Sequence, residues 1–484
     1  MGKMFGIFRM LLLLPLALGA LLIPACAWAG EGRETPKSAG APAKSPGIAP
    51  GSAGVLAEAA GVLPEGAGAL AEAGDSPAAP AVELGELVRE ATENNPAIQA
   101  ARETTESKKA RVPAEKALPD PMLSFQSMGN MAPPTLMRGD PSSGRFYSVQ
   151  QEFPFPGKRD LKGKIASTEA GTEEWNTEQT SRQVVADLKK AFYDYYLACI
   201  SSDIVRRDMD LLQSFSRVAE TKYRVGQGGQ QDVIKAGVEI SRQRERLAGL
   251  DQRREILAAR ISSLAYRPPG KELGRPAPFK KDELAYSFEE LCRVSEQNAP
   301  AIKIGEQGVT RSEYAVELAR KEYYPDVTLG LTYVEREANP DMYGLMVSAK
   351  VPLYFWEKQR PELEAAARGL SSARKQKDSA VSTVAYALRE SFAIAATSEK
   401  LLRLYETTLI PQSRSSLEAA FAGYQVGSVD FLTLVDSLIT LRDNELKYHE
   451  ALVEYEKALA QLEAVTGVEV TASKPREGDG RLAP

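Results

Sequence analysis

The methionines are the side chains whose chemistry and spacing suggest a function most directly. Three of the ten methionines lie in the first 29 residues, and six of the remaining seven fall in two stretches with the pattern of strand hairpins. These six are Met122, Met128, Met131, Met137, Met342 and Met346. Thioether sulfur is a good ligand for Cu(I) and other soft cations. Methionine is also an adaptable apolar filler, and contact with lipid or loop residues is the commoner reason for such a pattern.

Residues of the usual catalytic and metal-binding kinds are scarce. The chain has one histidine and three cysteines in 484 residues, too few for a typical His/Cys zinc cage. His449 lies among polar residues that suggest a solvated helix face, and the distant Cys199 and Cys292 suggest free thiols rather than a disulfide. We find no nucleophile elbow, phosphate loop or metal triad. The sequence therefore predicts neither an enzyme nor a bound cofactor.

The charge balance argues against nucleic acid as a partner. Lys and Arg number 60 against 65 Asp and Glu, which gives a net charge of −5. A surface that binds phosphate needs a basic surplus, which this chain does not have.

The N-terminus predicts export from the cytoplasm. Residues 1–29 have the pattern of a signal peptide, with the apolar run Met10–Ile23 and the cleavage site Ala27–Ala29. A lipobox that ends at Cys26 is the alternative, with that cysteine lipidated. Residues 30–82 are rich in Ala, Gly, Pro and Ser and predict a disordered leader. No later run is long and apolar enough to span a bilayer as a helix.

The rest of the chain has the pattern of an internal duplication. Four landmarks recur in the same order about 200 residues apart, a period far longer than that of solenoid repeats. They are Asn95–Ile98 with Ala299–Ile302, Pro121 with Pro325, Val149–Pro154 with Val347–Pro352, and Tyr223–Gly226 with Tyr424–Gly427. The sequence thus predicts a first repeat at 83–270, a linker at 271–284, a second repeat at 285–470 and a loose tail at 471–484.

Each repeat is expected to run helix, strand, strand, long helix, turn, helix. Apolar residues alternate with small or polar ones over 121–128, 145–153, 326–335 and 343–351. Alternation of this kind fits either a half-buried sheet in a soluble domain or a transmembrane barrel with a polar lumen. Export without an anchoring helix favours the barrel. Four strands cannot close one, since barrels need about eight, whereas three copies would supply twelve.

Two very long helices follow the strands. Lys158 to Val225 contains no proline and would reach about 100 Å as a helix. Glu362 to Val426 matches it in the second repeat and is interrupted by Pro411. Helices of this length must pack lengthwise in a bundle or tube. A soluble coiled-coil rod is the alternative, but a rod has no use for the strands.

Several short motifs stand in a fixed order between residues 83 and 470: Asn95-Pro96, Pro119–Pro121, Gln151–Pro154, the paired Tyr-x-Val-Gly turns and Ala458–Gly467. With these motifs the chain resembles the TolC family of outer membrane channels over residues 83–470. The resemblance implies a mostly α protein with a membrane β-barrel, in which a homotrimer forms a 12-strand barrel on a 12-helix periplasmic tunnel. Phe153–Arg159 and Tyr223–Gly228 resemble the branch that exports heavy metals with RND-type pumps.

The Tyr-x-Val-Gly turns have a structural and a functional interpretation. Gly226 and Gly427 follow long helices and suit a helix end that needs a positive φ. The resemblance implies that Val225, Gly226, Val426 and Gly427 dock the helical hairpins of a periplasmic adaptor.

The resemblance also implies a gate near the same turns. Asp232 and Tyr424 match a link between two coiled coils, and Val429 stands where the family prototype has an arginine. Asp436 matches one inner ring of carboxylates, and Thr433 stands at the other ring. The alternative for Asp232 is a carboxylate favoured by a helix N-terminus.

The function predicted from the sequence is a trimeric outer membrane channel, with its helical tunnel in the periplasm and its barrel in lipid. It would pass substrates, among them heavy-metal cations, from an inner-membrane pump and a periplasmic adaptor to the cell exterior. The alternative is a periplasmic coiled-coil adaptor or scaffold without a channel. These motifs specify neither the cargo nor the pump.

Overall fold

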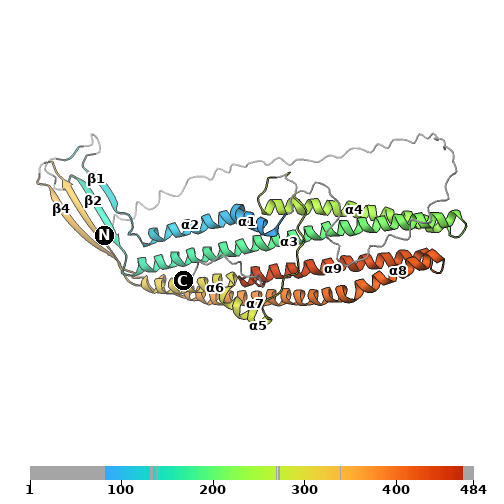
Figure 1. Cartoon of the computed structure of the whole chain (residues 1–484). Coiled ribbons are helices and arrows are strands. Elements are labelled where there is room, and N and C mark those ends of the chain that lie inside the picture. Colours follow the sequence, from blue (N-terminus) through green and yellow to red (C-terminus); the bar gives the residue numbers. More distant parts are fainter. Residues whose placement is uncertain are drawn as a thin grey trace, which may run out of the picture. The chain divides into compact units, whose positions relative to one another are not determined.

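The computed structural model describes residues 82–130, 135–137, 140, 142–268, 270, 273–337 and 339–471. The predicted signal peptide, almost all of the leader and tail, and Met131 lie outside these residues. Helices and strands appear in the same order twice (Figure 1). The first repeat contains α1 (Leu84–Asn94), α2 (Pro96–Lys116), β1 (Met122–Met128), β2 (Gly144–Phe153), α3 (Lys158–Arg224) and α4 (Gln230–Leu264). The second contains α5 (Phe288–Asn298), α6 (Pro300–Lys321), β3 (Asp326–Glu335), β4 (Met342–Lys350), α7 (Gln359–Leu404), the π-helix η2 (Tyr405–Leu409), α8 (Ile410–Val426) and α9 (Phe431–Thr466).

Each repeat begins with two helices where the sequence predicts one. The residues before Pro96 and Pro300 are extended, with ψ of 122° and 121°, because a proline disfavours the helical conformation of the residue before it. Asn95 caps α2 by accepting a hydrogen bond from the Ala97 amide at 2.9 Å. Its side-chain amide donates to the Leu264 carbonyl at 2.8 Å, which ties the start of the repeat to its end.

The four strands form one antiparallel sheet in the order β1-β2-β3-β4. Their limits lie within one residue of the ranges expected from the sequence. The β2–β3 pair joins the two repeats, for example Tyr147 opposite Tyr333. One-to-one pairing throughout puts all odd-numbered strand residues on one face and all even-numbered ones on the other. The odd face is mainly apolar and the even face mainly small or polar, and β1 and β4 are the two edges of the sheet.

Helix α3 contains 67 residues and extends from the sheet to the far end of the bundle (Figure 1). It packs against α2, α4, α6 and α9 along its length. The equivalent long helix of the second repeat is interrupted by η2, and a single residue lies between the end of η2 and Pro411. Proline has no N–H for the preceding turn, and a π-turn accommodates that loss. None of the described helices combines the length and apolar composition needed to cross a bilayer.

The described helices enclose three apolar clusters. Two of them lie around the middle of the bundle, one on α3 and α4 and the other on α7 and α9. The third lies near the turns and contains Phe215, Leu417 and Phe431. Beside the two mid-bundle clusters, the predicted linker pairs with the first and the last segment of the folded part that the structure describes, through the bridges Val82–Pro276 and Leu284–Thr471. Val82 and Thr471, predicted to belong to the leader and tail, are therefore parts of the folded unit.

Candidate functional site

The two Tyr-x-Val-Gly turns have the same backbone geometry. Gly226 and Gly427 have φ of +74° and +80°, as expected for their position after a helix. In the first turn the Gln227 amide donates to the Lys222 carbonyl at 2.8 Å, and in the second the Ser428 amide donates to the Gly423 carbonyl at 2.9 Å. Hydrogen bonds of this kind define a Schellman helix end, which needs glycine at the left-handed position. Sequence reasoning thus identified both turns and their glycines.

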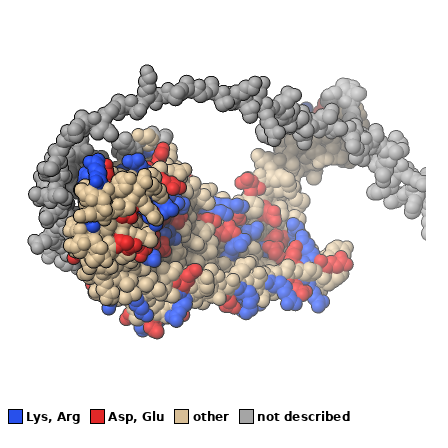
Figure 2. Space-filling view, turned by 90° about the vertical axis from the view of Figure 1, so that its right-hand side faces the viewer, with Lys and Arg blue, Asp and Glu red and all other residues tan. Residues whose placement is uncertain are grey.

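The residues beside both glycines are exposed. The side chains of Val225 and Val426 are 62% and 81% accessible. Apart from the adjoining residues of the turn itself, no described residue has a heavy atom within 4 Å of a Cβ built on Gly226 or Gly427, so both turns border open space. Figure 2 looks onto this end of the bundle, where uncharged side chains dominate the nearest surface. The four predicted docking residues therefore form two small apolar projections, which we call the turn tips.

The structure brings Asp232 and Tyr424 together. The Tyr424 hydroxyl lies 3.5 Å from Asp232 Oδ2, at the outer limit of a hydrogen bond. Tyr424 is buried against Phe431 in the third apolar cluster. Burial, and then the Asp232 carboxylate, raise the pKa of Tyr424 to about 12. The tyrosine therefore remains a neutral donor at physiological pH.

Sequence reasoning missed a third member of this contact, Lys222. Its ammonium donates to the Tyr424 carbonyl and lies 4.5 Å from the centre of the Tyr424 ring. It thus supplies a cation from the first repeat, whereas Val429, at the family's arginine position, is beside Gly423 and helps to close the second turn. The sequence signal that could have identified Lys222 is its position four residues before Gly226. At this position the Lys222 carbonyl accepts the hydrogen bond that closes the Schellman turn.

Thr433 and Asp436, the two predicted ring positions, are both exposed on one face of α9. The hydroxyl of Thr433 donates to Asp430, which also accepts from the Thr433 amide at 3.2 Å and caps the helix. These two hydrogen bonds lower the pKa of Asp430, and the one from the hydroxyl has the larger effect. Asp436 has no such partner among the described residues and can face water.

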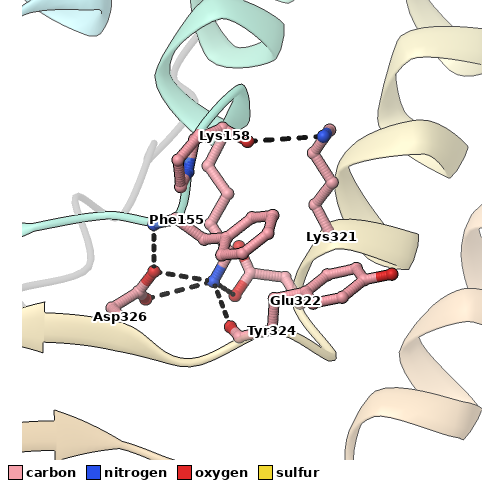
Figure 3. Close-up of polar contacts among 7 residues, drawn as sticks. Phe155, Lys158, Lys321, Glu322, Tyr324 and Asp326 are labelled. Carbon is pink, nitrogen blue, oxygen red and sulfur yellow. Dashed lines mark hydrogen bonds and ion pairs between the residues drawn. The ribbon is translucent and has the colours of Figure 1, made fainter.

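A second polar cluster lies where β2 turns into α3, at the Phe153–Arg159 motif (Figure 3). Lys158 is 3% exposed, and its ammonium lies 2.9 Å from Asp326 and 3.1 Å from Glu322. It also donates to the Tyr324 carbonyl at 3.1 Å. Asp326 accepts from the Phe155 amide at 2.7 Å, so one carboxylate holds both the lysine and the backbone before it.

The turn between β2 and α3, which we call the first corner, has its backbone held from both sides. The rings of Phe155 and Tyr324 stack at 4.4 Å. Lys321 donates to the Pro156 carbonyl at 3.3 Å and lies against Gly157, whose φ of +90° starts α3. The sequence motif thus marks a structural contact between the two repeats, and its acidic partners were not identified from the sequence.

The remaining candidates do not form a metal site. Among the described residues, no group of three His, Cys, Asp or Glu is placed to hold an ion. Cys199 and Cys292 are free. His449 does not lie on a solvated face as expected: it packs between Tyr196 and Tyr448, and its Nδ1 is buried without a described partner. Burial is the main cause that lowers the pKa of His449 to about 4.

Comparison with known proteins points to one family. Residues 291–468 match the family model described as outer membrane efflux protein. The cobalt-zinc-cadmium resistance protein CzcC of Cupriavidus metallidurans is 22% identical over 386 residues, which are 76% of this chain and 86% of CzcC. The outer membrane protein VceC of Vibrio cholerae has a TM-score of 0.67 at 14% identity, over 80% of this chain and 96% of VceC.

CusC, whose solved structures concern folding and transmembrane channel formation, gives a similar result. Its TM-score is 0.65 at 16% identity, over 80% of this chain and 92% of CusC. The similarity to VceC and CusC shows that this chain has their fold, mostly helical with four strands. These matches confirm the resemblance that the sequence motifs indicate: residues 291–468 are similar to the outer membrane efflux protein family, and most of the chain is similar to CzcC.

Proposed function

We propose that this protein is a trimeric channel of the outer membrane, in which three sheets close a 12-strand barrel above a periplasmic tunnel of twelve helices. The observation that carries the proposal is the four-stranded sheet with two open edges. Both edge strands are exposed along their whole length, including apolar residues such as Leu123 and Leu345. Unpaired edges of this kind pair with another strand or aggregate, and barrel closure removes them.

The odd face of the sheet has the composition of a lipid-facing surface. Val149, Leu331 and Leu345 lie on it and are exposed, whereas Ser148, Thr332 and Gly344 occupy the opposite face. A lumen filled with water favours small and polar residues, and lipid favours apolar ones. The even face is therefore the lumen in the proposed barrel.

Two aromatic bands flank the apolar residues of the odd face. The upper band crosses all four strands, with ring centres 5.2, 6.2 and 5.3 Å apart from Phe125 through Tyr147 and Tyr333 to Tyr343. The lower band contains the stacked pair Phe155–Tyr324 and the exposed residues 354–356. Tyr333 lies nine positions after Tyr324. In a tilted strand this is a height of about 25 Å, which matches the apolar thickness of an outer membrane barrel.

The turn tips would lie at the periplasmic end of the tunnel. We assign Val225, Gly226, Val426 and Gly427 to docking of a periplasmic adaptor, which connects the channel to an RND-type inner-membrane pump. Asp232, Tyr424, Thr433 and Asp436 belong to the closed entrance, with Lys222 as an added partner. Three copies would gather three Asp436 carboxylates around one axis, where they attract cations.

The similarity to CzcC, a cobalt-zinc-cadmium resistance protein, supports metal cations as the cargo. No catalytic step is part of this function, and transport needs a passage rather than a reaction.

Membrane fractionation followed by planar-bilayer recording tests the channel. We expect the protein in the outer membrane fraction and stepwise conductance after reconstitution. Leu345→Lys should abolish insertion because it places a charge on the lipid face, at about 2–4 kcal/mol near mid-membrane. Ser348→Lys on the lumen face is the matched control and should insert and conduct. A soluble protein without conductance would instead support a periplasmic scaffold.

Docking is tested at the second turn tip. Asparagine and aspartate both tolerate a positive φ better than most residues do, so Gly427→Asn and Gly427→Asp differ mainly in charge. We expect Gly427→Asp to abolish export at unchanged trimer yield and Gly427→Asn to retain most of it. Normal export by the aspartate variant would reject docking at this residue, and loss of trimer in both would assign the glycine to folding alone.

A further inference from the structure

All four methionines in the described strands lie on one face of the sheet. Met122 and Met128 of β1 and Met342 and Met346 of β4 are even-numbered, and the register places even positions on the polar face. In one row of that face, Met122 is followed by Gln150, Gly330 and Met346. The apolar face, where methionine would be expected as a lipid-facing residue, has none among the described strands.

These methionines also share a place along the sheet. They lie on the two edge strands, and the inner strands β2 and β3 contain none. Their accessible fractions range from 40% to 59%, so the chain itself does not bury them. Filling of a core therefore does not explain them within one copy.

Closure of the barrel would bring the methionines of β4 in one copy close to the methionines of β1 in the next. Where β4 of one copy pairs with β1 of the next, Met342 and Met346 would flank Met122 and Met128 of that copy, on the lumen side. Neighbouring strands lie about 4.8 Å apart, and opposite or diagonal side chains on one face reach each other. We call this line of contact the subunit seam.

The side chains around the seam favour a soft cation. Ser124, Gln126 and Gln150 share the face and supply neutral oxygens. The carboxylates among the described strand residues of this face are Glu152 and Asp326, and Asp326 is already paired with Lys158. Hard and borderline cations prefer carboxylate or imidazole, and soft monovalent cations prefer thioether sulfur. Gly330 also leaves room for movement, since a Cβ there would stand 3.1 Å from the Met346 methyl carbon.

We propose that the thioethers of Met122, Met128, Met342 and Met346 form a binding site for soft monovalent cations, Cu(I) or Ag(I), at each subunit seam in the barrel lumen. The proposal rests on the proposed function, because each site is complete only when β1 of a second copy meets β4. It names the class of metal that the lumen would bind. The rival explanation is that the methionines only pack against the neighbouring copy at the seam.

Silver binding to the purified trimer tests the site, because Ag(I) is redox-stable and soft. Binding is measured by calorimetry in nitrate buffer, on protein with Cys199→Ser and Cys292→Ser to remove the described thiols. We expect saturable Ag(I) binding and at least tenfold weaker binding of Zn(II). Met122→Leu with Met346→Leu should weaken Ag(I) binding at least tenfold. Met209→Leu, in helix α3, is the matched control and should have no effect.

Mass and conductance of each preparation separate the two proposals. A preparation that is not trimeric, or does not conduct, contradicts the proposed function. A conducting trimer that binds no Ag(I), or binds it equally in the double leucine variant, overturns the seam site and leaves the channel intact. If the double variant does not assemble, X-ray absorption of silver on the parent trimer decides, since sulfur neighbours support the site and purely oxygen or nitrogen neighbours overturn it.

Discussion

The two strand-to-helix corners of the chain occupy equivalent places in the repeats but differ in what covers them. Lys158 and Gln359 are the first residues of α3 and α7, and both are buried, at 3% and 8% exposure. The first corner is closed by Glu322 and Asp326 of the same chain. The second corner has no such ion pair among the described residues; the Tyr323 ring centre lies 6.3 Å from that of Phe355, and residues 353–356 remain exposed. Within one copy, therefore, only the first corner is closed by ion pairs.

The missing cover for the second corner has a counterpart in the chain. Pro325 precedes β3 beside the first corner, and Pro121 precedes β1 at the equivalent place. Because β1 is a free edge, the segment before it is available to another copy. We infer that the α2–β1 connection of one copy covers the second corner of the next.

The largest effect is expected from breaking the first corner. Lys158→Met removes a buried ammonium and leaves Asp326 and Glu322 without their cation, which costs about 3–5 kcal/mol of unfolding free energy. The measurement is the yield and thermal stability of folded protein in detergent. Lys164→Met is the control, because its ion pair with Asp160 is exposed on the same helix and should contribute little to stability. Equal effects of the two changes would contradict the assignment.

Aromatic substitutions should separate the two corners. Trp356→Ala is expected to weaken assembly by about 2–4 kcal/mol per interface, as for a buried anchor, while each copy still folds. Phe155→Ala should instead destabilise the single chain, because it removes the stack on Tyr324. The measurement is the fraction of trimer against detergent dilution. A trimer unaffected by Trp356→Ala would mean that lipid alone covers the second corner.

A third test compares Lys158 with a buried carboxyl group that has no ion pair among the described residues, Asp208 in the C-terminal half of α3. Burial raises the pKa of Asp208 from 3.8 to about 7, although Arg207 and Arg442 act to lower it. The unfolded carboxyl loses its proton near pH 4 and the folded one near pH 7, so the stability contributed by Asp208 falls as pH rises through this range. Asp208→Asn should therefore gain about 1–3 kcal/mol over the parent between pH 4 and 8. Parallel melting curves at both pH values would contradict this.

The smallest effect on stability is expected at the turn tips. Tyr424→Phe removes a 3.5 Å contact with Asp232 that contributes no more than about 0.5 kcal/mol. If the link holds the entrance, the same change should raise resting conductance and shorten closed times in single-channel recordings. Tyr448→Phe, in α9, is the matched control. A conductance identical to that of the parent would reject the gate role of Tyr424.

Local patterns in the sequence were sufficient for the strands and the turns. Alternation marked β1 to β4 to within one residue, and the paired glycines marked the two Schellman ends. Long-range partners were not predictable, because Lys158 meets Asp326 only after the two repeats pair through β2 and β3. The prediction that His449 lies on a solvated face was wrong for the same reason. Its sequence neighbours on α9 are polar, but Tyr196, which packs against it, comes from α3. The cation beside Tyr424 is Lys222 of the first repeat, which the resemblance did not indicate, because it places the prototype's arginine at Val429.

The central claim is that the open sheet closes only with two further copies. Native mass spectrometry of the detergent-purified mature protein tests it most directly. The account predicts one species with the mass of three chains, which separates into single chains when the detergent is made denaturing. A monodisperse single chain in mild detergent would contradict the account, because four strands with two exposed edges cannot form a closed barrel.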